Sequence, residues 1–292
     1  MKNAKLLVGF LLFSISAKAE LTASDPYVTS PRTPTHQLDI RVIRHGLKGR
    51  EAFIEEQIRA TETVYSQCPG LVLKINVTER IDQPSATEQE NSTDFIGNKS
   101  YVSPKFLDFM KPYAGDREQS KIIDVHMHEF LNEEIRKTKQ VTGAIHFGQS
   151  FNDSILNRVF LDPRTETAPS PTLSELVGET VHLAIETVAL NRSGGLKYKD
   201  KWSHPRNISL MAHEIGHLLL EAYDPVKNWY GDHWCPTLND SCPDGFLMSA
   251  GGNDDNSYTV PNKNKVLGYD ALPKLDAIQC DRLLNSSFIR RL

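Results

Sequence analysis

Long hydrophobic runs are almost absent from this chain of 292 residues. One apolar stretch, residues 6–15, is too short for a stable membrane anchor, because a transmembrane helix needs about 20 apolar residues. It follows a short basic segment, residues 1–5, and precedes Ala17-Lys18-Ala19, a small-residue pattern typical of signal-peptide cleavage sites. We therefore expect residues 1–19 to be a signal peptide and the mature chain to be secreted or periplasmic, with no membrane span.

A large excess of charge of one sign is also missing. The chain has 33 Lys and Arg against 37 Asp and Glu, a net charge of −4. This balance leaves no basic patch for nucleic acid and no membrane-surface signature. Internal repeats are absent too. Residues 20–37 are rich in Ser, Thr and Pro and predict a flexible lead-in or short pro-segment, and residues 38–292 predict one domain with a large core.

Cysteine is scarce, with four residues and no C-x-x-C spacing, which argues against a Cys-rich metal site. Disulfides fit an exported protein. Cys235 and Cys242 bracket a short loop, and a bridge there would leave Cys68 and Cys280 as the other pair. Four cysteines allow three pairings, and the sequence does not choose among them.

The most informative motif is H-E-x-x-H, formed by His213, Glu214 and His217. On a helix, residues four apart share a face, so two imidazoles at this spacing can bind one Zn²⁺. The Glu between them can take a proton from the metal-bound water. The motif therefore predicts a catalytic zinc centre with Glu214 as general base.

The surrounding sequence predicts the required helix. Asn207 or Ser203 can serve as N-cap, and Asp224-Pro225 ends the helical pattern. Apolar residues recur at helical spacing and predict a face buried in the core: Ile208, Met211, Ile215, Leu218 and Leu219.

A catalytic zinc site usually has three protein ligands, so a third is needed. Glu221 lies two helical turns, about 12 Å, from His213 along a straight helix, which is too far for one tetrahedral centre. Asp224 could bind only if the chain turned sharply before it. His233 follows Gly231, which lets the backbone fold back toward the metal. We favour His233 and keep Asp224 and Glu221 as alternatives.

This region resembles the metzincin metallopeptidases, whose motif H-E-x-x-H-x-x-G-x-x-H precedes a tight turn with a Met beneath the zinc. Residues 246–252 resemble that Met-turn, with Met248 in the Met position. Leu220 and Tyr223 replace the usual Gly and third His. In the leishmanolysin-like branch, a later His followed by Trp precedes a Leu-Met turn, and His233-Trp234 matches that pattern.

The resemblance implies a twisted sheet with an active-site helix and a zinc cleft. The upper subdomain would span about residues 38–222 and a smaller lower subdomain about residues 223–292. One Zn²⁺ would be held by His213, His217 and His233, with Met248 as apolar support. Because Leu220 replaces the Gly, we expect the helix to run another turn to Tyr223.

The pattern of elements predicts an α/β (α+β) fold. Alternating or apolar runs predict strands over residues 37–43, 71–77, 121–128, 141–147 and 181–188. Helices are predicted over residues 49–67 and 272–284, besides the motif helix. Residues 84–103 and 163–171 predict loops.

Two other motifs are weaker. Asp124, His126 and His128 alternate on one strand face, which predicts an exposed polar face, with a second metal site as the alternative. Asp254-Asp255-Asn256 is more typical of a turn than of a Ca²⁺ site.

These observations predict a secreted zinc-dependent endopeptidase acting on a protein or peptide substrate. One alternative is an exported, non-catalytic zinc-binding or adhesion module, although such a module has no use for Glu214. Another is a peptidase clan with an acidic third ligand on a later helix. That helix offers only Asp276 and Asp281, without an E-x-x-x-D pattern.

Overall fold

The computed structural model covers the chain in parts. The predicted signal peptide, residues 20–32 of the lead-in, His233, Cys242 and residues 254–256 lie outside the described residues. The structure describes residues 33–47, 49–80, 97–98, 101–102, 104–114, 121–131, 140–141, 148–151, 160–161, 177–193, 195, 197–198, 209–220, 223–224, 229–230, 234–235, 240–241, 246–248 and 272–292.

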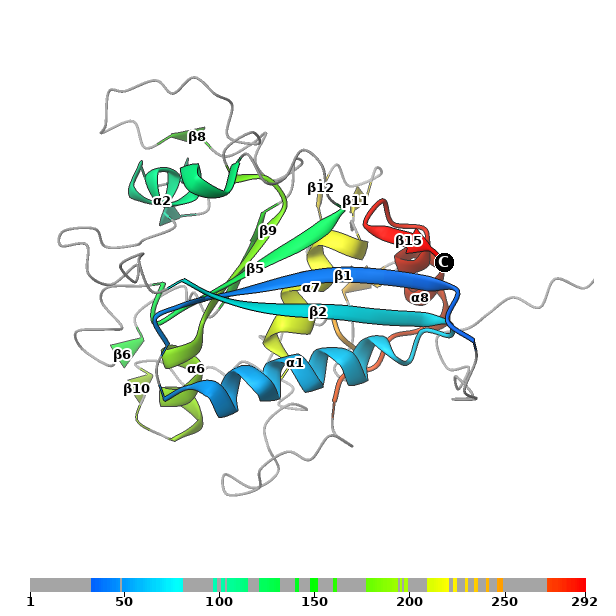
Figure 1. Ribbon diagram of the computed structural model, residues 1–292, viewed down its shortest axis with the longest axis horizontal. Helices are drawn as coiled ribbons and strands as arrows, with labels where there is room; N and C mark the ends of the chain where they lie inside the picture. Colours follow the sequence, from blue (N-terminus) through cyan, green and yellow to red (C-terminus); the bar gives the residue numbers. More distant parts are fainter. Residues whose placement is uncertain are drawn as a thin grey trace, which may run out of the picture.

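A six-stranded sheet forms the centre of the molecule (Figure 1). Its parallel strands are β1 (His36–His45), β2 (Leu71–Arg80), β5 (Ile122–His128) and β9 (Thr180–Ala184). Two antiparallel strands complete it. β7 (Gly148–Phe151) lies beside β9 at one edge, and β15 (Ile289–Arg291) pairs with the first three residues of β1.

Helices cover the apolar face of this sheet. Leu38, Ile40 and Val42 of β1 are fully buried and share one core with helices α1 (Glu51–Tyr65) and α7 (Leu210–Leu220). Side chains alternate between the two faces of a strand, so the intervening residues of β1 and β5 point to the other face. Helix α2 (Pro104–Ala114) covers part of that face with Phe106, Phe109 and Tyr113.

The last helix is tied to the first. Helix α8 (Ala277–Leu284) begins with a capping box, in which Asp276 accepts from the backbone N–H of Gln279 at 2.6 Å. A disulfide joins Cys68, just after α1, to Cys280 of α8. Cys68 and Cys280 are the pair expected from the sequence if Cys235 bridges Cys242.

Shorter elements surround the sheet. They are helix α6 (Ile185–Arg192) and strands β3 (Gly97–Asn98), β4 (Tyr101–Val102), β6 (Gln140–Val141), β8 (Phe160–Leu161), β10 (Lys197–Tyr198), β11 (Tyr223–Asp224), β12 (Trp229–Tyr230), β13 (Trp234–Cys235) and β14 (Asp240–Ser241).

The predicted α/β class is confirmed, and so are the strands predicted over residues 37–43, 71–77 and 121–128. The helices predicted over residues 49–67 and 272–284 are present but shorter, as α1 and α8. Among the described residues, no helix is long and apolar enough to cross a membrane.

Two predicted elements need correction. The strand predicted over residues 181–188 ends at Ala184, and α6 begins at Ile185, because an apolar run buried on all sides has no periodicity that separates strand from helix. Of the strand predicted over residues 141–147, Val141 lies in β6 and residues 142–147 lie outside the described part, so that prediction is not tested. The loop predicted over residues 84–103 contains β3 and β4.

The exposed polar face predicted for Asp124, His126 and His128 is also wrong. The two histidines are fully buried and Asp124 is 3% exposed. Aromatic side chains of α2 lie against this face. The polar residues that alternate along β5 therefore face a second buried layer and not water.

Candidate active site

Helix α7 carries His213, Glu214 and His217 through the core. It packs against α1, and two α1 side chains bind its backbone. The Gln57 Oε1 atom accepts from the Met211 N–H at 3.0 Å, and the Tyr65 hydroxyl donates to the Ala212 carbonyl at 2.9 Å. The predicted caps, Asn207 and Ser203, lie outside the described residues. In the first turn of α7, Gln57 accepts from the Met211 N–H, a contact between distant residues that sequence spacing does not reveal.

Burial along α7 singles out the two histidines. Every other residue of the helix is buried, whereas His213 and His217 are half-buried. Their ring centroids lie 4.8 Å apart with the planes nearly perpendicular. As the H-E-x-x-H spacing predicted, the two imidazoles lie side by side on one face of the helix. That face is the accessible strip of α7.

The tautomer of His213 follows from its partner. The His213 Nδ1 atom lies 2.6 Å from the Leu247 carbonyl oxygen. A carbonyl can only accept, so Nδ1 carries a proton and donates it, and in the neutral ring Nε2 is then the nitrogen with the lone pair. A backbone carbonyl on one ring nitrogen is the usual arrangement for a histidine that binds a metal through the other.

The turn that supplies this carbonyl packs beneath α7. Met248 is buried, and a Cβ built on Gly216 would lie 2.5 Å from its sulfur. Gly216 therefore lets the turn approach the helix backbone closely. The Leu247 N–H donates to the Lys274 carbonyl at 2.9 Å, which holds the turn from its other side.

Strand β7 contacts the carboxylate between the two histidines. The Ser150 hydroxyl lies 2.6 Å from Glu214 Oε2 and 2.6 Å from the Glu214 carbonyl oxygen. A Cβ built on Gly148 would lie 2.7 Å from Glu214 Oε1, so a larger residue there would collide with the carboxylate. Glu214 is 7% exposed and is held against the edge strand of the sheet.

Sequence reasoning missed Ser150 and Gly148. The signal available was a small residue and a hydroxyl residue alternating at positions 148 and 150, but pairing them with Glu214 requires the position of β7 beside α7. The structure brings both together with the carboxylate, across 64 residues of sequence for Ser150.

The predicted third ligands are not brought to this cluster within the described part of the chain. His233 and Glu221 lie outside it, and Asp224 is known only as part of β11. The helix predicted to run to Tyr223 is wrong, because α7 ends at Leu220 and Tyr223 pairs with Tyr230 in a strand. Among the residues with described side chains, no group of three or more His, Cys, Asp or Glu is placed to hold a metal ion.

Asp276 and Asp281 were considered as acidic third ligands for another peptidase clan. Neither forms a metal-binding group with the histidines of α7 among the described residues. Asp276 caps α8 and is 1% exposed, and Asp281 is exposed on the same helix.

Comparison with known proteins finds similarity in solved structures. No protein-family model and no curated protein matches this chain. Among solved structures it is similar to metalloproteinase-II from Bacteroides fragilis, at 14% sequence identity and a TM-score of 0.32. The match covers 69% of this chain and 49% of the other, so this chain spans about half the length of that metalloproteinase.

Proposed function

We propose that this chain is an exported zinc-dependent endopeptidase of the metzincin type. The observation that carries the proposal is the hydrogen bond from His213 Nδ1 to the Leu247 carbonyl. It engages Nδ1 of one motif histidine and leaves Nε2 for a metal, on a helix where only the two motif histidines are half-buried. A pair of ordinary surface histidines has no need of this arrangement.

In this proposal, Zn²⁺ is held by His213, His217 and His233. In the sequence, His233 comes directly before β13, which pairs with β14. Asp224 and Glu221 remain the alternatives for the third position. When bound, zinc lowers the pKa of a coordinated water toward about 7 and polarises the scissile carbonyl.

Glu214 is the general base. Its carboxylate takes a proton from the attacking water and passes it to the leaving amine. Ser150 acts through Glu214 as a positioning residue, since its hydroxyl bonds Oε2 and limits rotation of the carboxylate. Gly148 leaves room beside Oε1. Met248 supports the helix beneath the site and is not a ligand.

The proposal includes export of the chain to an oxidising compartment. Residues 1–19 serve as the signal peptide, and the Cys68–Cys280 disulfide is compatible with an oxidising compartment. Residues 20–37 serve as a lead-in or short pro-segment before a catalytic domain that spans residues 38–292.

Elemental analysis and a digestion assay on the purified chain without residues 1–19 test the proposal. We expect about one zinc per chain and hydrolysis of an unfolded protein substrate that stops on addition of a chelator. Zinc without hydrolysis would favour an exported, non-catalytic zinc-binding module. A chain that binds no zinc would refute both.

A further inference from the structure

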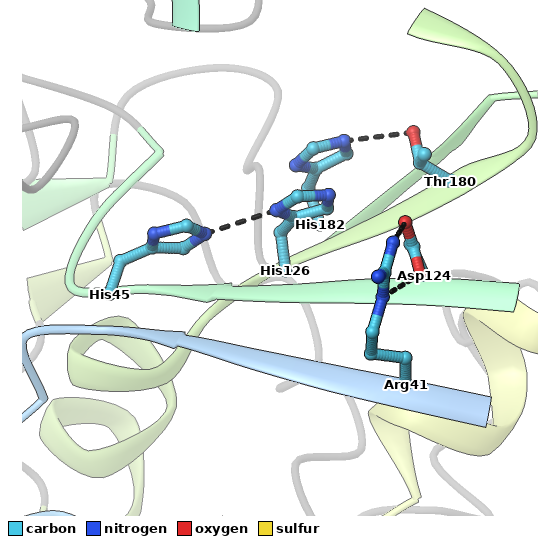
Figure 2. Close-up of polar contacts among 6 residues, drawn as sticks. All are labelled: Arg41, His45, Asp124, His126, Thr180 and His182. Carbon is cyan, nitrogen blue, oxygen red and sulfur yellow. Dashed lines mark hydrogen bonds and ion pairs between the residues drawn. The ribbon is translucent and has the colours of Figure 1, made fainter. Parts of the chain in front are cut away.

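Four histidines form a buried layer on the face of the sheet opposite α7. They are His45 of β1, His126 and His128 of β5, and His182 of β9, and all are fully buried. We call them the histidine layer. Figure 2 shows three of them in a row across neighbouring strands, together with Thr180 and the Arg41–Asp124 ion pair.

The rings are ordered as two hydrogen-bonded pairs. His45 Nε2 lies 3.0 Å from His126 Nδ1, and His128 Nε2 lies 3.0 Å from His182 Nδ1. The pairs then stack on each other, with centroids 4.9 Å apart for His45 and His128 and 4.8 Å apart for His126 and His182. His182 Nε2 lies 3.0 Å from the Thr180 hydroxyl.

Helix α2 closes this layer with aromatic side chains. The Phe106 ring lies 4.8 Å from His182, the Phe109 ring lies 4.9 Å from His45, and the Tyr113 ring lies 4.7 Å from His126. The opposite side of α2 is exposed, where Lys111 pairs with Asp108. Three aromatic side chains of α2 therefore dock on the sheet through contacts with imidazoles.

Each pair requires at least one neutral ring. A hydrogen bond between two imidazoles needs one protonated nitrogen and one bare nitrogen, so two fully protonated rings cannot form it. Full protonation would bring two N–H groups face to face in both pairs and would stack cations within 5 Å. Burial, followed by the charges of His45 and His182, lowers the pKa of His128 well below its ordinary value.

Among the described residues, the other groups facing the layer come from four elements. Asp124 of β5 accepts from Arg41 Nε at 2.8 Å and from Arg41 Nη2 at 2.7 Å, so this carboxylate is already engaged by a cation of β1. Helix α2 contributes the Tyr113 ring, and β9 contributes the Thr180 hydroxyl.

We propose that α2 is a pH-dependent cap, docked on the histidine layer at neutral pH and released from it in mildly acidic solution. In the released state the rings reach water and take up protons near the usual histidine pKa of about 6.5, whereas in the docked state burial and the paired hydrogen bonds oppose protonation. Above about pH 6.5 neither state gains protons and docking is unaffected. Below it, each histidine favours release by up to about tenfold per pH unit, until the docked ring also protonates.

Hydrogen exchange of the full chain tests the cap. Exchange of residues 104–114 is compared with that of α1 at about pH 7.5 and about pH 5, after correction for the intrinsic pH dependence of exchange. We expect exchange in α2 to rise at least about tenfold at the lower pH while α1 keeps its protection. Unchanged α2 protection would overturn the proposal, and so would an equal loss in both helices, which would mean global acid unfolding.

A double variant removes the titration of one pair but keeps a hydrogen bond. In His45→Gln with His126→Asn, the amide groups replace Nε2 and Nδ1 at similar positions. We expect its α2 to lose less protection at about pH 5 than α2 of the unmodified chain, because only His128 and His182 still titrate. The control His36→Gln, outside the layer on the same strand, should behave as the unmodified chain. An unchanged pH response in the double variant would overturn the proposal. If the double variant does not fold, the comparison of α2 with α1 in the unmodified chain still decides.

A metal is the competing explanation for four clustered histidines. Zinc titration of a chain with His213→Ala and His217→Ala separates the two. We expect no tight zinc binding there and no effect of zinc on α2 protection. Stoichiometric zinc binding that protects α2 and disappears in the double variant would make the layer a metal site and would overturn the pH cap.

Discussion

Glu214 joins two kinds of environment. It lies between two half-buried histidines on α7, yet its carboxylate is held by a buried serine of the edge strand. A catalytic base needs this combination of access on one side and fixed orientation on the other.

The first prediction concerns this carboxylate. Glu214→Gln should keep the fold and the zinc but reduce peptide hydrolysis at least about 10²-fold, because an amide cannot take the proton from water. Zinc content and kcat measured on the same preparation check it. Near-full activity with zinc bound would mean that Glu214 is not the base.

The second prediction concerns Ser150. Ser150→Ala removes a hydrogen bond to the charged carboxylate, so the pKa of Glu214 should rise and the acidic limb of the kcat/KM profile should move to higher pH. We also expect kcat to fall about tenfold with zinc content unchanged, the scale of a hydrogen bond to a charged group. Ser193→Ala, which removes an exposed hydroxyl bound to the Leu190 carbonyl, is the control. An unshifted profile would leave Ser150 with a structural role only.

The third prediction concerns the remaining ligand. His233→Ala should lose zinc on dialysis, while Asp224→Ala and Glu221→Ala should keep about one zinc per chain. Zinc retained in the first variant and lost in the second would transfer the ligand to Asp224. Loss only in the third would argue against a metzincin site.

At this scale, the sequence predicted what depends on local spacing. His213 and His217 share a helix face because they are four residues apart, and that held. The contacts of Ser150 and of the Leu247 carbonyl could not be predicted, because they join residues 64 and 34 positions apart.

Helix α7 depends on its neighbour α1 for its first turn. The Met211 N–H is one of the groups that an isolated helix leaves unsatisfied, and here Gln57 of α1 accepts it in a buried position. A helix whose cap comes from another helix can be fixed in place only when both have docked.

The fourth prediction follows from this cap. Gln57→Ala should lower the free energy of unfolding by about 1–3 kcal/mol, the cost of leaving a buried N–H group without its acceptor. Glu62→Ala, on the exposed side of α1, should change it by less than about 0.5 kcal/mol. Denaturant titration of both variants measures the difference, and equal effects would contradict a capping role for Gln57.

Elements were predictable where periodicity is strong. The alternation in β1 and the apolar stripe of α1 identified both elements. The boundary between β9 and α6 was not predictable, since residues 180–185 are buried on every side and tertiary contacts alone decide where the helix starts.

The whole molecule is braced by one long-range covalent link. The Cys68–Cys280 disulfide joins residues 212 positions apart. Closing so long a loop lowers the conformational entropy of the unfolded chain and so stabilises the folded state.

The fifth prediction tests this brace. Cys68→Ala with Cys280→Ala should lower the free energy of unfolding by about 2–5 kcal/mol, measured by denaturant titration under oxidising conditions. Adding reductant to this variant is the informative control. A further loss of stability would report the predicted second bridge between Cys235 and Cys242, and no further loss would argue against it.

The sequence predicted the class of the molecule but not its layers. The alternation of Asp124, His126 and His128 was correct as a strand pattern and wrong about its surroundings, because nothing local shows that residues 104–114 fold over that face. Which element covers a sheet depends on topology, and topology is a property of the whole chain.

The antiparallel pairing of β15 with the start of β1 has a consequence for the timing of biosynthesis. His36 lies opposite Arg291, and the Leu292 N–H donates to the Thr35 carbonyl at 2.9 Å. The ribosome makes β1 long before β15, so the sheet stays incomplete until residues 289–291 emerge. Until then, residues 36–38 of β1 can pair with β2 on one side, while the edge that β15 later covers stays open.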